Sequence, residues 1–352
     1  MSVIRPDQGI GATGEDTLVR AAAQLTRTLN APLPAIFWGD LLGSTALGYL
    51  AVALACGSGA VEIRLLAGAV AILALYRAES FIHELSHLKP GAVKGFSVVW
   101  NLLIGIPLLT PSFLYDGVHN LHHARTRYGT AQDPEYLPLA AMSPLTLPLS
   151  VALAGAAPAL LLIRFALLGP ISALIPGLRR IVVERFSALT INPAFRREPP
   201  RGPQRRRWLI LETATSVWSI GVVGAALAEL IPLHVLLVCT AILSGIAMLN
   251  QIRTLVAHLW ASDGAPLSIT EQYLDSVNVP PPGWLPELWA PVGLRYHALH
   301  HLLPGIPYHR LGEAHLRLSA MLPAGSHFPR ADHRGLVQNL RRLAFATRRS
   351  AK

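Results

Sequence analysis

The sequence predicts an all-α integral membrane protein with about four transmembrane helices in two hairpins and further helices embedded in the membrane or lying at its surface. Hydrophobic residues make up 52% of the 352 residues and charged residues only 14%, a composition typical of membrane proteins. Apolar runs near the ~20 residues that cross a bilayer occur in two closely spaced pairs. Histidines cluster after several apolar runs, which predicts a cytoplasmic helical cap that carries them.

The first predicted hairpin joins residues 35–56 to residues 65–82, and each arm contains only one or two charged residues. The segment before it, residues 1–34, is polar and lacks the pattern of a cleavable signal peptide. We therefore expect residues 1–34 to form an N-terminal cytoplasmic segment and the first membrane helix to be retained.

The second predicted hairpin joins residues 208–230 to residues 233–252 through a tight turn at Pro232. Two other apolar stretches, residues 96–114 and 143–176, are interrupted by prolines. Such segments enter the membrane and return, or lie along it, where protein groups or water form hydrogen bonds with their free backbone groups. We therefore expect four spanning helices and two embedded pieces.

The basic residues predict the orientation of the chain. The net charge of +10 comes mostly from arginines between the apolar runs, not along an aromatic face, so we expect no nucleic acid partner. The loop before the second hairpin is rich in arginine, which places it in the cytoplasm by the positive-inside rule. If each hairpin crosses twice, both termini and the histidine clusters are cytoplasmic. Residues 321–352 are expected to form a basic C-terminal tail, and its Arg-rich part after Arg341 is expected to fray or contact lipid.

Eight of the 14 histidines fall in three short boxes. Positions i, i+3 and i+4 share one face of a helix, so each box directs two or three imidazoles toward one point. Neutral imidazole binds Fe, Zn, Cu and Ni, and eight such ligands suit two metal ions with open positions for an oxidant. The boxes are His83 with His87, His119 with His122 and His123, and His297 with His300 and His301.

A ninth candidate ligand, His258, follows the last apolar run at the same membrane boundary. Three acids flank the second box and are candidates to orient its imidazoles by hydrogen bonds, although solvated loop acids are an equally good interpretation. These acids are Asp116, Asp133 and Glu135.

Other residues narrow the chemistry. Cys56 and Cys239 both lie within apolar runs, so neither a disulfide framework nor a thiolate metal site is available. Any metal must be held by nitrogen and oxygen ligands. His309 and His315 follow the third box, and their role stays open between orienting a ligand and packing.

The order and spacing of the boxes resemble the membrane fatty acid desaturase superfamily, whose signature is HxxxH or HxxxxH followed by two HxxHH boxes. The resemblance covers residues 35–320, which we take as a single desaturase-like domain. It implies that the nine histidines bind two non-haem iron ions and that O₂ is the co-substrate. It also implies desaturation of a lipid acyl chain, but hydroxylation of an acyl, alkyl or carotenoid-like chain stays open because the same ligands serve both reactions.

Two details leave the form of the substrate open. His258 lies in an Ala-His-Leu-aromatic context similar to that of acyl-CoA desaturases, but Thr254 stands where those enzymes have an asparagine. The first box has the shorter HxxxH spacing, which looks more like acyl-lipid desaturases and membrane hydroxylases.

The sequence has no fused haem-binding motif, no CxxC pair and no nucleotide-binding glycine motif, so we expect a separate ferredoxin or cytochrome-type electron donor. Two other classes remain. His83-Glu84 to His87 also fits the HExxH pattern of an intramembrane zinc protease, which would leave the other boxes unexplained. A metal transporter would need polar groups at mid-depth in the bilayer.

Overall fold

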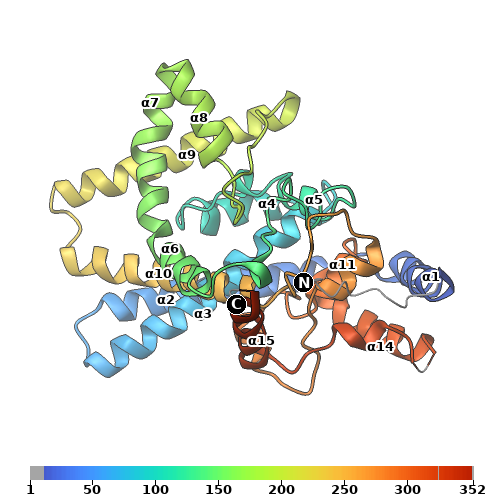
Figure 1. Cartoon of the computed structure of the whole chain (residues 1–352). Helices are drawn as coiled ribbons and strands as arrows, with labels where there is room; N and C mark the ends of the chain where they lie inside the picture. Colours follow the sequence, from blue (N-terminus) through green and yellow to red (C-terminus); the bar gives the residue numbers. More distant parts are fainter. Residues whose placement is uncertain (1–11, 324, 351–352) are drawn as a thin grey trace.

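The computed structural model describes residues 12–323 and 325–350 (Figure 1). These residues form helices and loops without a β-strand, so the predicted all-α fold class is confirmed. In chain order the helices, with short 3-10 and π-helical segments labelled η, are α1 Ala12–Leu29, α2 Pro34–Cys56, α3 Val61–His87, α4 Phe96–Trp100, η1 Asn101–Gly105, η2 Ser112–Leu114, α5 His119–His122, η3 Leu139–Ala141, α6 Thr146–Ile163, η4 Arg164–Leu168, α7 Gly169–Leu174, α8 Pro176–Phe186, α9 Gly202–Leu227, α10 Leu233–Leu255, α11 Ile269–Asp275, α12 Pro286–Trp289, α13 His297–Leu302, η5 Tyr308–Arg310, α14 Leu311–Met321, η6 Phe328–Ala331 and α15 Leu336–Ser350.

Five helical stretches in the described chain are long and apolar enough to cross a membrane. They expose large apolar side chains such as Leu66 and Leu227, which suits a lipid surround rather than water. The multi-pass character predicted from composition is therefore supported. The five stretches are α2, α3, α6 with η4 and α7, α9, and α10.

Short turns join α2 to α3 and α9 to α10, as the two predicted hairpins require, and both turns lie at the same end of the molecule, on the left in Figure 1. Of these two pairs, only α2 and α3 pack against each other along their length. α2 packs closely along α3, and a Cβ at Gly48 would lie only 2.5 Å from Cδ2 of Leu75. α3 continues to His87 instead of ending near residue 82. The first histidine box is therefore the last turn of a membrane helix.

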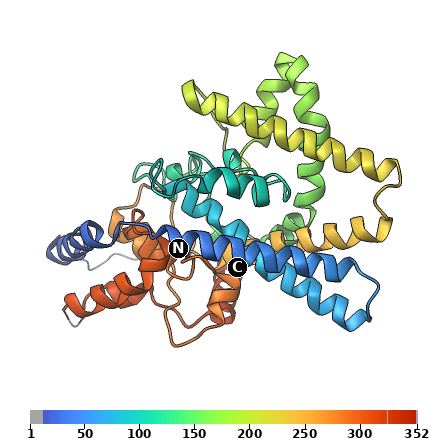
Figure 2. The same cartoon turned by 180° about the vertical axis from the view of Figure 1, so that it is seen from behind.

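Residues 143–176 are more continuous than their prolines led us to expect. Thr146–Leu174 runs as one helical stretch with a π-helical segment at Arg164–Leu168, which makes five candidate spans instead of about four. Pro158 lies inside α6, and membrane helices tolerate such prolines where neighbouring helices and local π-helical adjustments satisfy the freed backbone groups. In both views this stretch runs across the direction of α9 and α10 and bridges them (Figures 1 and 2).

Residues 96–114 form a short apolar helix that turns back on itself. α4 and η1 together extend only from Phe96 to Gly105, too short to cross a bilayer. The Asn101 side chain donates to the Ser97 carbonyl and accepts from the Ser112 amide, at 2.7 and 2.8 Å. These two hydrogen bonds hold the returning chain against the short helix, as expected for a segment that does not cross the membrane.

A helical cap lies at the end of the hairpins opposite their turns and contains α1, α11, α13 and α14 (Figure 2). α1 buries Leu18, Ala22, Leu25 and Leu29, which share one helix face, in the hydrophobic cluster of this cap.

The C-terminal tail differs from the frayed segment expected. In its described part, α15 is a packed helix that buries Leu343. A guanidinium nitrogen of Arg342 donates to the carbonyl oxygen of His258 at 3.2 Å. The tail therefore supports the backbone next to a candidate ligand.

Candidate metal centre

Three helical segments and one loop position the predicted histidines. His83 and His87 lie one turn apart at the end of α3, so their imidazoles share a helix face. The second box forms α5 and the residue after it, and the third box lies in α13. His258 lies three residues beyond α10, where a β-bridge to Ser276 fixes its backbone.

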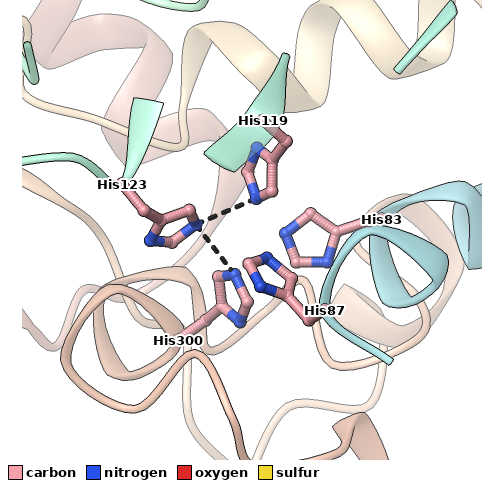
Figure 3. A group of neighbouring side chains, drawn as sticks. All are labelled: His83, His87, His119, His123 and His300. Atoms are coloured by element: carbon pink, nitrogen blue, oxygen red, sulfur yellow. Dashed lines mark hydrogen bonds between the residues drawn. The ribbon is translucent and has the colours of Figure 1, made fainter. Parts of the chain in front are cut away.

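The structure brings all nine predicted histidines together in two neighbouring groups. Within each group, one ligand nitrogen of every ring lies within 4.8 Å of the others. In the first group, five imidazoles from α3, the second box and α13 face a common centre (Figure 3). The first group contains His83, His87, His119, His123 and His300, and the second contains His122, His258, His297 and His301.

The distances between ring nitrogens fit a shared metal ion. In the first group, Nε2 of His123 lies 2.9 Å from Nε2 of His119 and 3.1 Å from Nε2 of His300. In the second group, Nε2 of His297 lies 3.0 Å from Nε2 of His258 and 3.2 Å from Nε2 of His301. Two nitrogens bound to one ion at about 2.1 Å and near right angles would lie about 3 Å apart.

Most of these rings are buried, and several nitrogens have no partner in the described protein. Both ring nitrogens of His83 and Nε2 of His87 are buried without a hydrogen bond. Buried polar atoms are normally satisfied, so such orphaned atoms indicate a missing ligand. Together with the imidazole-only donor set, they fit Fe, Zn, Cu or Ni.

Carboxylates fix the orientation of two rings in the second box. Nδ1 of His119 lies 3.0 Å from a carboxylate oxygen of Glu135, whose other oxygen accepts from Tyr115. Nδ1 of His122 lies 2.9 Å from a carboxylate oxygen of Asp133. A carboxylate only accepts hydrogen bonds, so Nδ1 of each ring carries the proton and Nε2 presents its lone pair to the metal site.

The ring of His258 is held through an intervening tyrosine. Its Nδ1 lies 2.8 Å from the hydroxyl of Tyr128, which donates to Asp275 at 3.0 Å. Tyr136 donates to the same carboxylate oxygen at 2.9 Å. Burial raises the pKa of Asp275 to about 6. The Nε2 atom of His258 is thereby directed at the second group.

The environment keeps most of the imidazoles neutral. Burial lowers the pKa of six rings well below the usual value, and the charges of neighbouring histidines lower it further. Burial also acts on His122, but the charge of Asp133 outweighs it and the pKa is raised. Metal binding needs a deprotonated ring nitrogen. These six rings, all outside the candidate membrane-spanning helices, are His119, His123, His258, His297, His300 and His301.

Two later histidines lie outside both groups. Nε2 of His309 accepts a hydrogen bond from the Leu33 amide at 3.1 Å, and its ring packs edge-on against Phe37. Nε2 of His315 lies 3.0 Å from both carboxylate oxygens of Asp332. Both histidines connect parts of the protein and have no contact with the nine clustered rings.

Of the three acids that flank the second box, two contact its histidines and one does not. Asp116 forms an ion pair with Arg207 at 3.6 Å, whereas Asp133 and Glu135 contact box histidines. The Thr254 hydroxyl donates to the Asn250 carbonyl at 2.9 Å within α10. It therefore does not take the role of the family's asparagine through a side-chain amide.

The protease alternative has little support from this geometry. Glu84 would have to act on a metal-bound water, but its carboxylate accepts a hydrogen bond from the Tyr308 amide at 3.1 Å. His83 and His87 are also surrounded by three histidines from the other boxes. The HExxH pattern is thus part of a larger imidazole site.

Sequence reasoning missed Asp275 and the tyrosines that contact the rings. Tyr115 lies four residues before His119, so helical spacing was a usable signal for this residue. Asp275 and Tyr136 had no such signal, because they reach the His258 environment through contacts between distant segments.

A cavity of about 300 Å³ opens beside both groups. Its lining includes His83 and His119 from the first group and His258 and His297 from the second. α6 and the middle of α10 supply apolar side chains, whereas α3 and the end of α10 supply polar ones. A molecule in this cavity would contact histidines of both groups.

Comparisons with known proteins agree with the sequence pattern. The family model described as fatty acid desaturase matches residues 60–331. The chain is 47% identical over 324 residues to a protein of Caulobacter vibrioides (strain NA1000 / CB15N) named ceramide hydroxylase, and the match covers 92% of each chain. No solved structure matches the chain.

Proposed function

The chain belongs to the membrane fatty acid desaturase and hydroxylase superfamily, and on this premise we propose that it is a di-iron, O₂-dependent hydroxylase of a ceramide-class lipid. The observation that carries this proposal is the 47% identity to a ceramide hydroxylase over nearly the whole of both chains. The nine clustered imidazoles are the proposed ligands of the two iron ions.

The iron ions would supply oxidation of an unactivated C–H bond, which no amino acid side chain performs alone. One atom of O₂ enters the C–H bond as a hydroxyl and the other leaves as water, with two electrons and two protons from a donor. The protein's own residues keep the imidazoles oriented and neutral and provide the cavity beside them. We propose that a separate ferredoxin or cytochrome-type protein delivers the electrons on the cytoplasmic side.

Desaturation is the second candidate, favoured by the description of the matching family model. It would remove hydrogens from two neighbouring carbons of an acyl chain and reduce O₂ to two waters with the same two electrons and two protons. The ligand set is compatible with both reactions, so the product distinguishes them.

Mass spectrometry of host lipids tests the proposal. Cells that express the protein should accumulate ceramides with one added oxygen, and cells that express the His122→Ala variant should not. Ceramides that lose two hydrogens and gain no oxygen would identify desaturation instead. Unchanged lipids from an iron-loaded protein with its electron donor present would contradict both candidates.

Metal analysis tests the ligand assignment independently. Purified His122→Ala and His300→Ala proteins should contain less than two iron ions per chain, because each loses a proposed ligand from a different group. His234→Ala is the matched control, since His234 is exposed on α10. Retention of two irons in either box variant would contradict the assignment.

A further inference from the structure

We propose that Glu79 and Arg253 bind the uncharged amide and hydroxyl head of the substrate lipid, and that the oxidised carbon therefore lies close to this head rather than far along a chain. Both residues line the cavity beside the histidine groups. The inference rests on the proposed function, since it assumes that a lipid is the substrate of this site.

These two residues differ from other charged residues of the apolar helices. Asp40 and Arg77 form an ion pair with a 2.6 Å contact, and Glu212 pairs with Arg164 at 2.5 Å. Within the described chain, neither Glu79 nor Arg253 has an oppositely charged group within 4.0 Å. An ionisable residue in a membrane helix is costly, so one without such a partner indicates a functional site.

Arg253 is the more informative of the pair. Its Nε atom is buried without a hydrogen-bond partner, although a buried guanidinium normally makes several such bonds. Its charge also acts on the nearby rings of His258 and His297. An arginine beside a site for two metal cations is electrostatically unfavourable, and a hydrogen-bond acceptor on a ligand would offset this cost.

Glu79 places the bound head next to the metal site. It lies four residues before His83 on α3, which is one helical turn or about 6 Å along the axis. Its carboxyl group lines the same cavity. A group held by Glu79 therefore lies within one turn of a proposed iron ligand.

Further polar residues line the same cavity. The side chains of Asn250 and Gln251, from the turn of α10 before Arg253, also line it. The Thr110 hydroxyl is buried there beside Glu79. An amide with two hydroxyls offers donors and acceptors to such a set, as a plain hydrocarbon chain does not.

The charges favour a neutral head over an ionic one. An ionised Glu79 repels a phosphate, and Arg253 repels an ammonium group. Among the apolar residues that line the cavity are Ala154, Pro158 and Leu161 of α6. The arrangement fits a lipid whose neutral polar head lies at the histidines and whose chain extends along α6.

Direct binding tests the inference with iron-loaded protein in lipid nanodiscs. The probes are a ceramide with a six-carbon acyl chain and the 1-phosphate of the same ceramide. The wild-type protein should bind the ceramide at least about tenfold more tightly, as expected for one lost or repelled charge-assisted contact. Equal binding of the two probes by the wild-type protein would overturn the inference.

Two variants assign the effect to the named residues. Glu79→Gln and Arg253→Gln should each weaken ceramide binding about tenfold while iron content is unchanged. Glu79→Gln should also narrow the preference for ceramide over its phosphate, which a merely structural role would not do. The controls Glu62→Gln and Arg206→Gln change exposed residues on α3 and α9 and should bind like wild type. Wild-type binding in both cavity variants would overturn the inference.

The position of the new hydroxyl gives a second readout. Tandem mass spectrometry should locate it on a carbon near the amide, and a hydroxyl in the middle or at the end of a chain would contradict the inference. Hydroxylation with wild-type binding in both variants would leave the proposed function intact and reject the head-group site alone. Ceramide binding that depends on both residues without any oxygenated product would reject the proposed function alone.

Discussion

At the scale of single residues, the candidate centre depends on hydrogen bonds that orient imidazoles. Asp133 and Glu135 contact Nδ1 of His122 and His119 directly, and Asp275 acts on His258 through Tyr128. These acids leave the opposite ring nitrogens free to bind metal. The second box and His258 are therefore held in place before any ion binds.

Asp133→Asn should weaken iron binding by about 10- to 100-fold, the usual cost of losing a carboxylate behind a histidine ligand. The asparagine side-chain amide can donate as well as accept a hydrogen bond, so it no longer keeps the proton of His122 on Nδ1. Iron retention against a chelator measures the effect. Asp116→Asn is the matched control because Asp116 pairs with Arg207 and contacts no box histidine. Equal iron retention in the two variants would refute the orienting role of Asp133.

The buried rings also predict how stability depends on pH in the metal-free protein. Burial lowers the pKa of His258, His297 and His301 well below its ordinary value. The unfolded chain, with a histidine pKa near ~6.5, then binds protons that the folded chain does not. Stability is full above that pH and is lost as the pH falls below it. The thermal midpoint of chelator-treated protein should fall from pH 7 to pH 5.5, and a constant midpoint would contradict this.

At the scale of helices, an ion network joins the bridging stretch to its neighbours. Glu212 of α9 pairs with Arg164 of η4 and with Arg179 of α8, at 2.5 and 2.7 Å. Trp208 donates to the same carboxylate at 3.2 Å. The π-helical segment carries Arg164 into this network. These contacts hold the bridge between α9 and α10, and α6 of that bridge lines the cavity.

Glu212→Ala should destabilise the protein by about 3–5 kcal/mol, because it leaves the buried Arg164 without its counter-charge. Glu184→Ala is the control, since its partner Arg180 is exposed and such surface pairs contribute about 0–1 kcal/mol. The midpoint of thermal unfolding in detergent compares the two variants. Similar midpoints would show that the network contributes little to stability.

At the scale of the whole molecule, the hairpin turns and the cap lie at opposite ends (Figure 1). All nine histidines lie toward the cap side, at or beyond the ends of α3 and α10. The candidate centre is thus at a membrane boundary, with the cavity extending between the helices. This arrangement is compatible with the proposed lipid substrate, which would reach the centre between the apolar helices.

Reporter fusions test the orientation that the arginines predict. A reporter that works only in the cytoplasm should be active when fused after Lys352, and inactive when inserted at the turn near Pro232. A reporter that works only outside the cytoplasm should give the opposite pattern. Activity of the cytoplasmic reporter at the turn but not at the C-terminus would contradict the predicted orientation.

The sequence by itself determined the features that depend on local spacing. Apolar runs of bilayer length identified both hairpins, because each such helix satisfies its own backbone within the run. The histidine spacing identified eight of the nine clustered rings, and the position of His258 after the last apolar run identified the ninth. The prolines of residues 143–176 hid the helical continuity of this stretch, because the cost of a proline in a helix depends on neighbouring segments whose positions the sequence does not give.

Only the tertiary structure decided how the histidines are shared between the two groups. His122 and His123 are neighbours in sequence but belong to different groups, since consecutive helix positions point about 100° apart. The spacing predicts that these two rings point in different directions. It does not predict which rings of the other boxes lie beside each of them. The Tyr128 and Asp275 partners and the polar cavity near Glu79 likewise depend on packing between segments far apart in the chain. Local periodicity supplied the candidate ligands, and long-range packing brought them together.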